Sequence, residues 1–156
     1  MTGSTAKRFI GTKIIFALAM TRLAYNEYRG WSLPADENGA DDGYLVEYTD
    51  GGAPNHPDHA GYISWSPKAQ LDNAYRATAG MSFGLAIEAL KLGKRVSRAG
   101  WNGAGMWLEY RPASGVDLAF VRLSYPVQSK AYPDGARVSW APSQTDMLAD
   151  DWQLVE

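Results

Sequence analysis

A short repeated phrase is the sequence feature that most restricts the fold of this chain. Residues 63–67 read Ile-Ser-Trp-Ser-Pro, and residues 138–142 read Val-Ser-Trp-Ala-Pro. Two further matches keep the same order, Gly-Trp at 30–31 and 100–101 and Leu-Val-Glu-Tyr at 45–48 against Trp-Leu-Glu-Tyr at 107–110. Because the order is kept while the loops change length, the pattern is typical of a duplicated module. The sequence therefore predicts two small related modules.

Each module is predicted to have an α+β fold, with a mainly antiparallel β-sheet and one or two short helices. We expect a loose leader over residues 1–12, an N-terminal module over 13–77 and a C-terminal module over 81–156, with Arg-Ala-Thr-Ala-Gly at 76–80 between them. The shared Ser-Trp-x-Pro element is interpreted as scaffold. It supplies a strand, a tryptophan anchor and a proline that helps a helix begin.

The C-terminal module has the clearest local patterns. Ser82 is predicted to cap a helix of about ten residues that Gly93 ends, because apolar residues recur at helical spacing between them. Strands are expected within 95–101, 106–112, 117–127 and 131–142, the last with Trp140 in its middle. Ser143 and Asp146 have capping-box spacing, which predicts a short helix to Ala149 before a closing extended segment.

Composition excludes several classes of protein. The 156 residues include no cysteine, so disulfides, thiolate metal sites and cysteine nucleophiles are absent. A net charge of −2 argues against duplex DNA as a partner, because such a partner requires a basic face. The longest apolar run, residues 14–20, is too short to span a membrane, and we interpret it as a buried strand rather than an export segment.

The chain lacks the residue patterns of common catalytic sites. The two histidines, His56 and His59, flank a proline and are interpreted as part of a solvated turn rather than as metal ligands. Asp146 is better explained as a capping residue, and Asp150 and Asp151 as helix-end or surface carboxylates, than as acid and base. We therefore predict no catalytic residue, no metal site and no cofactor.

Two segments are candidates for binding a small ligand. Trp101 precedes a glycine-rich turn, so its ring could stack on a base while nearby backbone N–H groups hold phosphate or ribose oxygens. The alternative is that Trp101 anchors the core and the turn only closes a hairpin. The start of the helix at residues 143–145 could hold an anion or could be a simple cap, and Arg98 could reach a phosphate.

The C-terminal module also resembles a known family. Two segments carry the resemblance, Met81 to Pro112 and residues 140–156. Over about residues 81–156 the chain is similar to the Thoeris anti-defense 2-like family of phage and prophage proteins. The resemblance implies a small α+β protein that forms homo-oligomers, often tetramers, in the cytoplasm of the infected bacterium. Such proteins sequester cyclic nucleotide immune signals, such as glycocyclic ADP-ribose or cyclic dinucleotides, and do not break the ligand.

The resemblance also implies which residues bind the ligand. They belong to the two family motifs or lie beside them, and they are Arg98, Trp101, Asn102, Gly103, Met106, Ser143, Gln144, Thr145 and Asp146. Residues 112–131 lack a longer insertion that some members carry, which leaves the identity of the ligand open. The N-terminal part resembles a phage module with no assigned activity. A structural or protein-binding phage accessory protein and a cyclic nucleotide hydrolase are the alternative functions.

Overall fold

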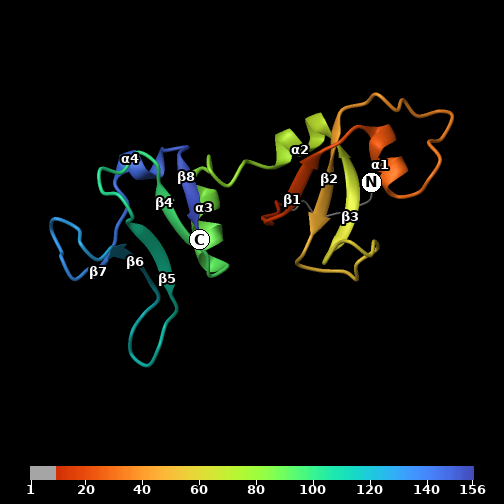
Figure 1. The fold of residues 1–156 in the computed structure, drawn as a ribbon. Coiled ribbons are helices and arrows are strands. Elements are labelled where there is room, and N and C mark those ends of the chain that lie inside the picture. The colour runs from red at the N-terminus through yellow and green to blue at the C-terminus, as the bar shows by residue number, and fades with distance from the viewer. Residues whose placement is uncertain (1–9) are drawn as a thin grey trace, which may run out of the picture. The chain divides into compact units, whose positions relative to one another are not determined.

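The computed structural model describes residues 10–156, and the chain divides into two compact units between Tyr75 and Arg76. The described residues form four α-helices and eight β-strands, arranged as two separate antiparallel sheets (Figure 1). The predicted α+β class with two modules is therefore confirmed. None of the helices within residues 10–156 is long and apolar enough to cross a membrane. The predicted leader lies almost entirely outside the described residues.

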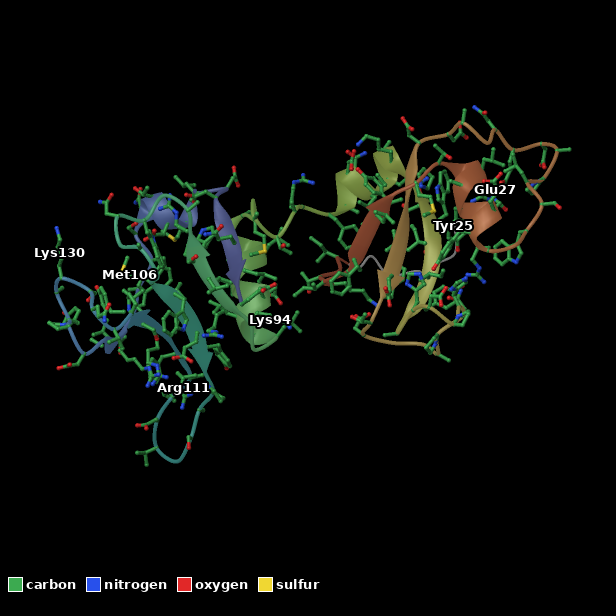
Figure 2. The ribbon with its side chains drawn as sticks, viewed as in Figure 1. Tyr25, Glu27, Lys94, Met106, Arg111 and Lys130 are labelled. Carbon is green, nitrogen blue, oxygen red and sulfur yellow. The ribbon has the colours of Figure 1, made fainter. Side chains whose placement is uncertain are left out.

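The N-terminal unit is a three-stranded sheet with two short helices. Its elements are β1 (Phe16–Ala19), α1 (Arg22–Tyr28), β2 (Gly43–Tyr48), β3 (Tyr62–Pro67) and α2 (Lys68–Ala74), and the strand order is β1-β2-β3. The Thr21 side chain caps α1 by accepting a hydrogen bond from the backbone of Ala24. Tyr25 of α1, labelled in Figure 2, is buried against Leu45 and Ile63. These three side chains form the small core of the unit.

The first strand corrects one expectation from the sequence. All four residues of β1 are exposed, and Phe16 and Leu18 keep 64% and 61% of their surface accessible. The apolar run at 14–20 is therefore not a buried strand. The reason is the position of β1, which pairs only with β2 and lies at the edge of the sheet. Apolar side chains at such an edge can stay exposed, because apolar composition alone does not require burial.

The repeated Ser-Trp-x-Pro phrase has the predicted scaffold role in the N-terminal unit. Trp65 lies in β3, and its indole N–H donates to the carbonyl of Met20 at 2.9 Å. Pro67 stands at the N-cap of α2. Helix α1, in contrast, was not predicted, because only a few of its side chains reach the core and the apolar spacing is weak.

The C-terminal unit is a five-stranded sheet with one longer helix on it. Its elements are α3 (Phe83–Lys91), β4 (Arg95–Arg98), β5 (Trp107–Arg111), β6 (Phe120–Tyr125), β7 (Ala136–Ser139), α4 (Gln144–Met147) and β8 (Trp152–Val155), and the strand order is β7-β6-β5-β4-β8. Ser82 caps α3 and Gly93 follows it with a positive φ of 78°, as predicted. The side chains of α3 pack against Val96, Leu108 and Leu123 of the sheet.

Two boundaries in this unit differ from the predictions. The helix expected to run to Ala149 ends at Met147. Trp140 lies just after β7 instead of inside a strand, although its N–H still donates to the carbonyl of Val121 at 3.0 Å. In both cases the chain leaves regular structure early and keeps its polar backbone groups bonded.

The segment between the predicted modules is attached to the C-terminal unit. The carbonyl of Thr78 accepts a hydrogen bond from Leu154 of β8 at 2.9 Å. Met81 and Trp152 exchange a pair of backbone hydrogen bonds at 2.8 and 3.2 Å. The start and the end of this unit therefore lie side by side.

The structure agrees with the proposed duplication at one pair of residues and differs from it at another. Glu47 lies in the central strand of the first sheet and Glu109 in that of the second. Trp31, however, follows a helix, whereas its partner in the alignment, Trp101, follows strand β4. The internal repeat stays a prediction.

Packing of the C-terminal core predicts the cost of shortening one side chain. Leu108 is fully buried at the centre of the sheet, so Leu108→Ala should destabilise the protein by about 2–5 kcal/mol through lost burial and a residual cavity. Leu118 is 84% exposed, and Leu118→Ala should change stability by less than about 0.5 kcal/mol. Urea unfolding of the full chain, followed by tryptophan fluorescence, measures both. Equal losses in the two variants would contradict this core.

Candidate functional site

The carboxylate of Asp146 is the centre of the candidate site. Its Oδ2 atom accepts hydrogen bonds from the backbone N–H of Ser143 at 3.0 Å and from the Ser143 hydroxyl at 2.7 Å. The hydroxyl oxygen in turn accepts from the backbone of Asp146 at 3.1 Å, which completes the capping box of α4. The S-x-x-D spacing predicted this arrangement correctly, because all its contacts are local.

The second oxygen of the same carboxylate binds two residues that are distant in the sequence. Its Oδ1 atom accepts from Nη1 of Arg98 at 2.9 Å and from the indole Nε1 of Trp101 at 3.1 Å. Asp146 therefore joins α4 to the end of β4 and to the turn that follows. It is also buried, with 9% of its surface exposed.

Arg98 is held by a second carboxylate that the sequence did not reveal. Its Nε and Nη2 atoms donate to Asp151 at 2.7 and 3.4 Å, and Asp151 also accepts from the backbone N–H of Gly100 at 2.7 Å. Asp151, interpreted from the sequence as a helix-end or surface carboxylate, is 34% exposed and holds both Arg98 and the backbone at the start of the turn after β4. Arg98 and Asp151 are 53 positions apart, and no local pattern indicates such a pair.

The hydrogen bonds determine the charge of the Asp146 carboxyl. Burial by itself raises the pKa of this group, but the donors of Ser143, Trp101 and Arg98 outweigh burial and hold the pKa well below its usual range. Hydrogen bonds to Asp151 and Asp146 raise the pKa of the Arg98 guanidinium. The cluster is thus one fixed cation between two fixed anions, with a net negative charge.

Trp101 has the core-anchor role that was one of the two alternatives, and its stacking on a base stays a prediction. Its ring packs edge-on to Trp152 with centroids 5.6 Å apart and at a tilt to Trp140 at 6.3 Å, so it anchors the core. It is nevertheless only half-buried, and the exposed Asn102 follows it. The indole orientation is fixed by packing on one side and by Asp146 at its N–H.

The turn between β4 and β5 contains the other residues predicted from the first motif. Gly105 has a positive φ of 75°, a conformation that favours glycine. The Met106 side chain, labelled in Figure 2, lies so close to Gly103 that a Cβ there would be 2.5 Å from Met106 Cε. Within residues 10–156, the backbone N–H groups of Asn102, Gly103 and Gly105 donate to no protein acceptor. The turn thus presents free donors beside an aromatic ring.

The second motif contributes exposed side chains next to the carboxylate. Gln144 and Thr145 lie in the single turn of α4, and both are exposed. The N–H of Asp146 is already used by Ser143, so the start of α4 acts as the simple cap that was one of the two alternatives. The structure therefore brings Arg98, Trp101, Ser143 and Asp146 into one network. That these four residues, or Asn102, Gly103, Met106, Gln144 and Thr145, contact a ligand stays a prediction.

The two histidines do not form the solvated turn expected from the sequence. The side chains of His56 and His59 are only 15% and 16% exposed, and His59 lies between Glu47 and Tyr28. Pro57 interrupts the segment, as expected, but the loop folds back on α1 and buries both rings. In the part of the chain that the structure describes, no group of three or more histidine, aspartate and glutamate side chains could hold a metal ion.

Comparison with known proteins assigns the C-terminal unit. A family model described as the Thoeris anti-defense 2-like domain matches residues 81–155. Thoeris anti-defense 2 of Bacillus phage SP01 is 40% identical over 84 residues, which are 48% of this chain and 94% of that protein. The chain belongs to the Thoeris anti-defense 2-like family. The family domain contains the whole Asp146 network, whereas the N-terminal unit lies outside the matched residues.

The lowered pKa of Asp146 predicts how stability depends on pH. A carboxylate with a lower pKa in the folded state contributes stability that is complete above the unfolded pKa of about 3.9 and is lost as pH falls toward the folded value. Asp146→Asn should reduce stability at pH 7 and flatten the loss of stability between about pH 5 and pH 2. Thermal unfolding across this pH range measures both effects.

Asp150→Asn is the matched control for this prediction. Asp150 is exposed, and its side chain makes no hydrogen bond or ion pair with any residue from 10 to 156. This variant should keep the pH profile of the wild-type protein. A profile that is the same in wild type and in Asp146→Asn would show that the carboxylate does not support the fold.

Proposed function

We propose that this protein is a phage anti-Thoeris protein that binds a cyclic nucleotide immune signal and sequesters it without degrading it. The proposed ligand is a cyclic ADP-ribose isomer such as glycocyclic ADP-ribose, with cyclic dinucleotides as a further class. Family membership and the identity of 40% to Thoeris anti-defense 2 of a Bacillus phage support the biological role. The geometry around Trp101 supports the class of ligand.

One observation carries the ligand class: an oriented indole is followed by a turn with free N–H donors. A nucleotide offers a flat base, ribose hydroxyls and phosphate oxygens, which match a ring face and backbone donors. Arg98 is already bound by two carboxylates. Phosphate oxygens are therefore expected at the turn of residues 102–105, and Arg98 is expected to orient Trp101 through Asp146 instead of contacting phosphate.

The same network favours binding over hydrolysis. A general acid must hold a proton at neutral pH, but the low pKa of Asp146 keeps its carboxyl ionised. Four donors already occupy its oxygens, two from Ser143 and one each from Arg98 and Trp101. Asp151 is likewise committed to Arg98 and Gly100. Both carboxylates are thus positioned to build the site.

A second copy of the chain would complete this site. The turn and α4 are exposed on a single chain, whereas small-ligand sites usually enclose most of the ligand surface. We propose a homo-oligomer, a dimer or a tetramer, acting in the cytoplasm of the infected bacterium. Light scattering coupled to size exclusion chromatography measures the number of chains.

Calorimetry with a ligand panel tests the proposed function. The full chain is titrated with cyclic ADP-ribose isomers, cyclic dinucleotides and cyclic trinucleotides, and at least one should bind more tightly than about 10 μM, roughly −7 kcal/mol. Heating the complex should release the ligand intact and in stoichiometric amount. Weak or absent binding to every compound would end the proposal, and turnover of the ligand would replace sequestration by hydrolysis.

Gly103→Ala separates a ligand site from a merely structural turn. The new Cβ meets only the flexible end of Met106, so the fold should survive while the turn surface changes and affinity falls at least about tenfold. Gly84→Ala is the control, because a Cβ at this helical position would make only an ordinary contact with the Ser82 hydroxyl at 3.9 Å and should stabilise α3 slightly. Calorimetry measures the affinity of both variants, and thermal unfolding measures their stability. Unchanged affinity in Gly103→Ala would move the site away from this turn.

A further inference from the structure

Four side chains of the N-terminal unit form a hydrogen-bonded chain that the proposed function does not use. His59 Nδ1 lies 2.9 Å from Oε2 of Glu47, and His59 Nε2 lies 2.9 Å from the hydroxyl oxygen of Tyr28. The His56 ring stacks on Tyr28 with centroids 4.5 Å apart. Carboxylate, imidazole and hydroxyl therefore follow one another in the order that activates hydroxyl nucleophiles in enzymes.

Three elements bring these residues together. Tyr28 is the last residue of α1, Glu47 lies in the central strand β2, and the histidines belong to the loop between β2 and β3. Asn55 fixes that loop through two hydrogen bonds with the backbone of Ile63, at 2.8 and 2.9 Å. The loop is therefore tied back onto the sheet, which holds the imidazole rings beside the end of α1.

Gly61 allows the loop to pass close to the end of strand β2. A Cβ at Gly61 would clash with the carbonyl oxygen of Tyr48, so the chain can pass this close to β2 only with glycine at this position. The N–H of Gly61 donates to Oε1 of Glu47 at 2.9 Å. The other carboxylate oxygen is thereby left for His59, and each oxygen of Glu47 has its own donor.

The hydrogen bonds assign the protons along the chain. Hydrogen bonds from His59 and then from the Gly61 N–H lower the pKa of Glu47, so its carboxylate is an acceptor at neutral pH. Because Glu47 offers only acceptor oxygens, we assign the proton of the neutral His59 ring to Nδ1, and the lone pair of Nε2 then accepts the proton of Tyr28. His56 Nδ1 is 3.5 Å from the same hydroxyl and accepts from the backbone of Asp58 at 3.3 Å, so it is the weaker partner.

The tyrosine of this cluster is more exposed than the histidine and the glutamate behind it, as a reactive site requires. Tyr28 keeps 37% of its surface accessible, whereas the side chains of His59 and Glu47 are 16% and 17% exposed. The hydroxyl can therefore meet a reagent while its base and the orienting carboxylate are sheltered. Two acidic side chains, Glu47 and the exposed Asp58, flank the histidines, which disfavours an anionic phosphate reagent and favours a neutral one.

We propose that Tyr28 is an activated nucleophile that accepts acyl groups from neutral activated esters, with His59 as its general base and Glu47 as a positioning residue. The Tyr28 oxygen attacks the ester carbonyl carbon, and its proton passes to Nε2 of His59. The bond from that carbon to the leaving oxygen then breaks, and the same proton neutralises the departing alkoxide. The products are an O-acyl tyrosine and the free alcohol, with no oxidant or reductant required.

Acetylation by p-nitrophenyl acetate tests this proposal on the chain of residues 1–156. Tyr110 is the internal control, because it is also 37% exposed and no residue from 10 to 156 makes a hydrogen bond to its hydroxyl. An ordinary tyrosine with a pKa of about 10 is scarcely ionised at pH 7. Peptide mass spectrometry should find Tyr28 acetylated about 100-fold faster than Tyr110, the scale of general-base catalysis. Equal rates in the folded wild-type protein would overturn the proposal.

Variants of the base distinguish activation from simple tethering of the loop. His59→Gln keeps a polar contact to Tyr28 but cannot take its proton, so the Tyr28 rate should fall to that of Tyr110. Glu47→Gln should give an intermediate rate. In His59→Gly, added imidazole should restore part of the Tyr28 rate, a result that a structural role would not produce. A folded His59→Gln protein with the wild-type Tyr28 rate would overturn the role of His59. If a variant unfolds, the ratio of the Tyr28 and Tyr110 rates in the wild-type protein still tests the proposal.

Discussion

The carboxylate of Asp146 is the interaction on which the C-terminal unit depends. It closes the first turn of α4, holds the indole N–H of Trp101 and pairs with the guanidinium of Arg98. The backbone carbonyl of the same residue accepts the indole N–H of the fully buried Trp152 at 3.0 Å. One residue thus connects a cap, a core tryptophan and the candidate ligand surface. A buried charge is tolerated there only because every donor is in place.

This dependence explains why scaffold and site are hard to separate in the family motifs. Trp101 is packed among other tryptophans, yet it stands at the start of the exposed turn. Ser143 caps a helix, and in doing so it fixes the carboxylate that orients Trp101. The residues proposed to meet the ligand are therefore Trp101, which belongs to this network, and its neighbours in the turn and in α4, and the network supplies their rigidity.

The N-terminal unit shows a different use of buried polar groups. Its relay of Glu47, His59 and Tyr28 ends at an accessible hydroxyl instead of being enclosed on all sides. It lies outside the residues that match the family. The proposed reactivity at Tyr28 and the proposed nucleotide binding beside Trp101 are thus separate proposals, and either can hold without the other.

Local contacts were predictable from the sequence, and distant ones were not. The caps at Ser82 and Ser143, the stop at Gly93 and the α+β character follow from bonds within three or four residues and from apolar spacing. The pairing of Arg98 with Asp151 joins residues 53 positions apart, and that of Tyr28 with His59 spans 31. The exposure of β1 depends on its place at the edge of the sheet. Only strand order and register decide such contacts, because a sequence pattern indicates which residues are apolar or charged but not which distant residue they meet.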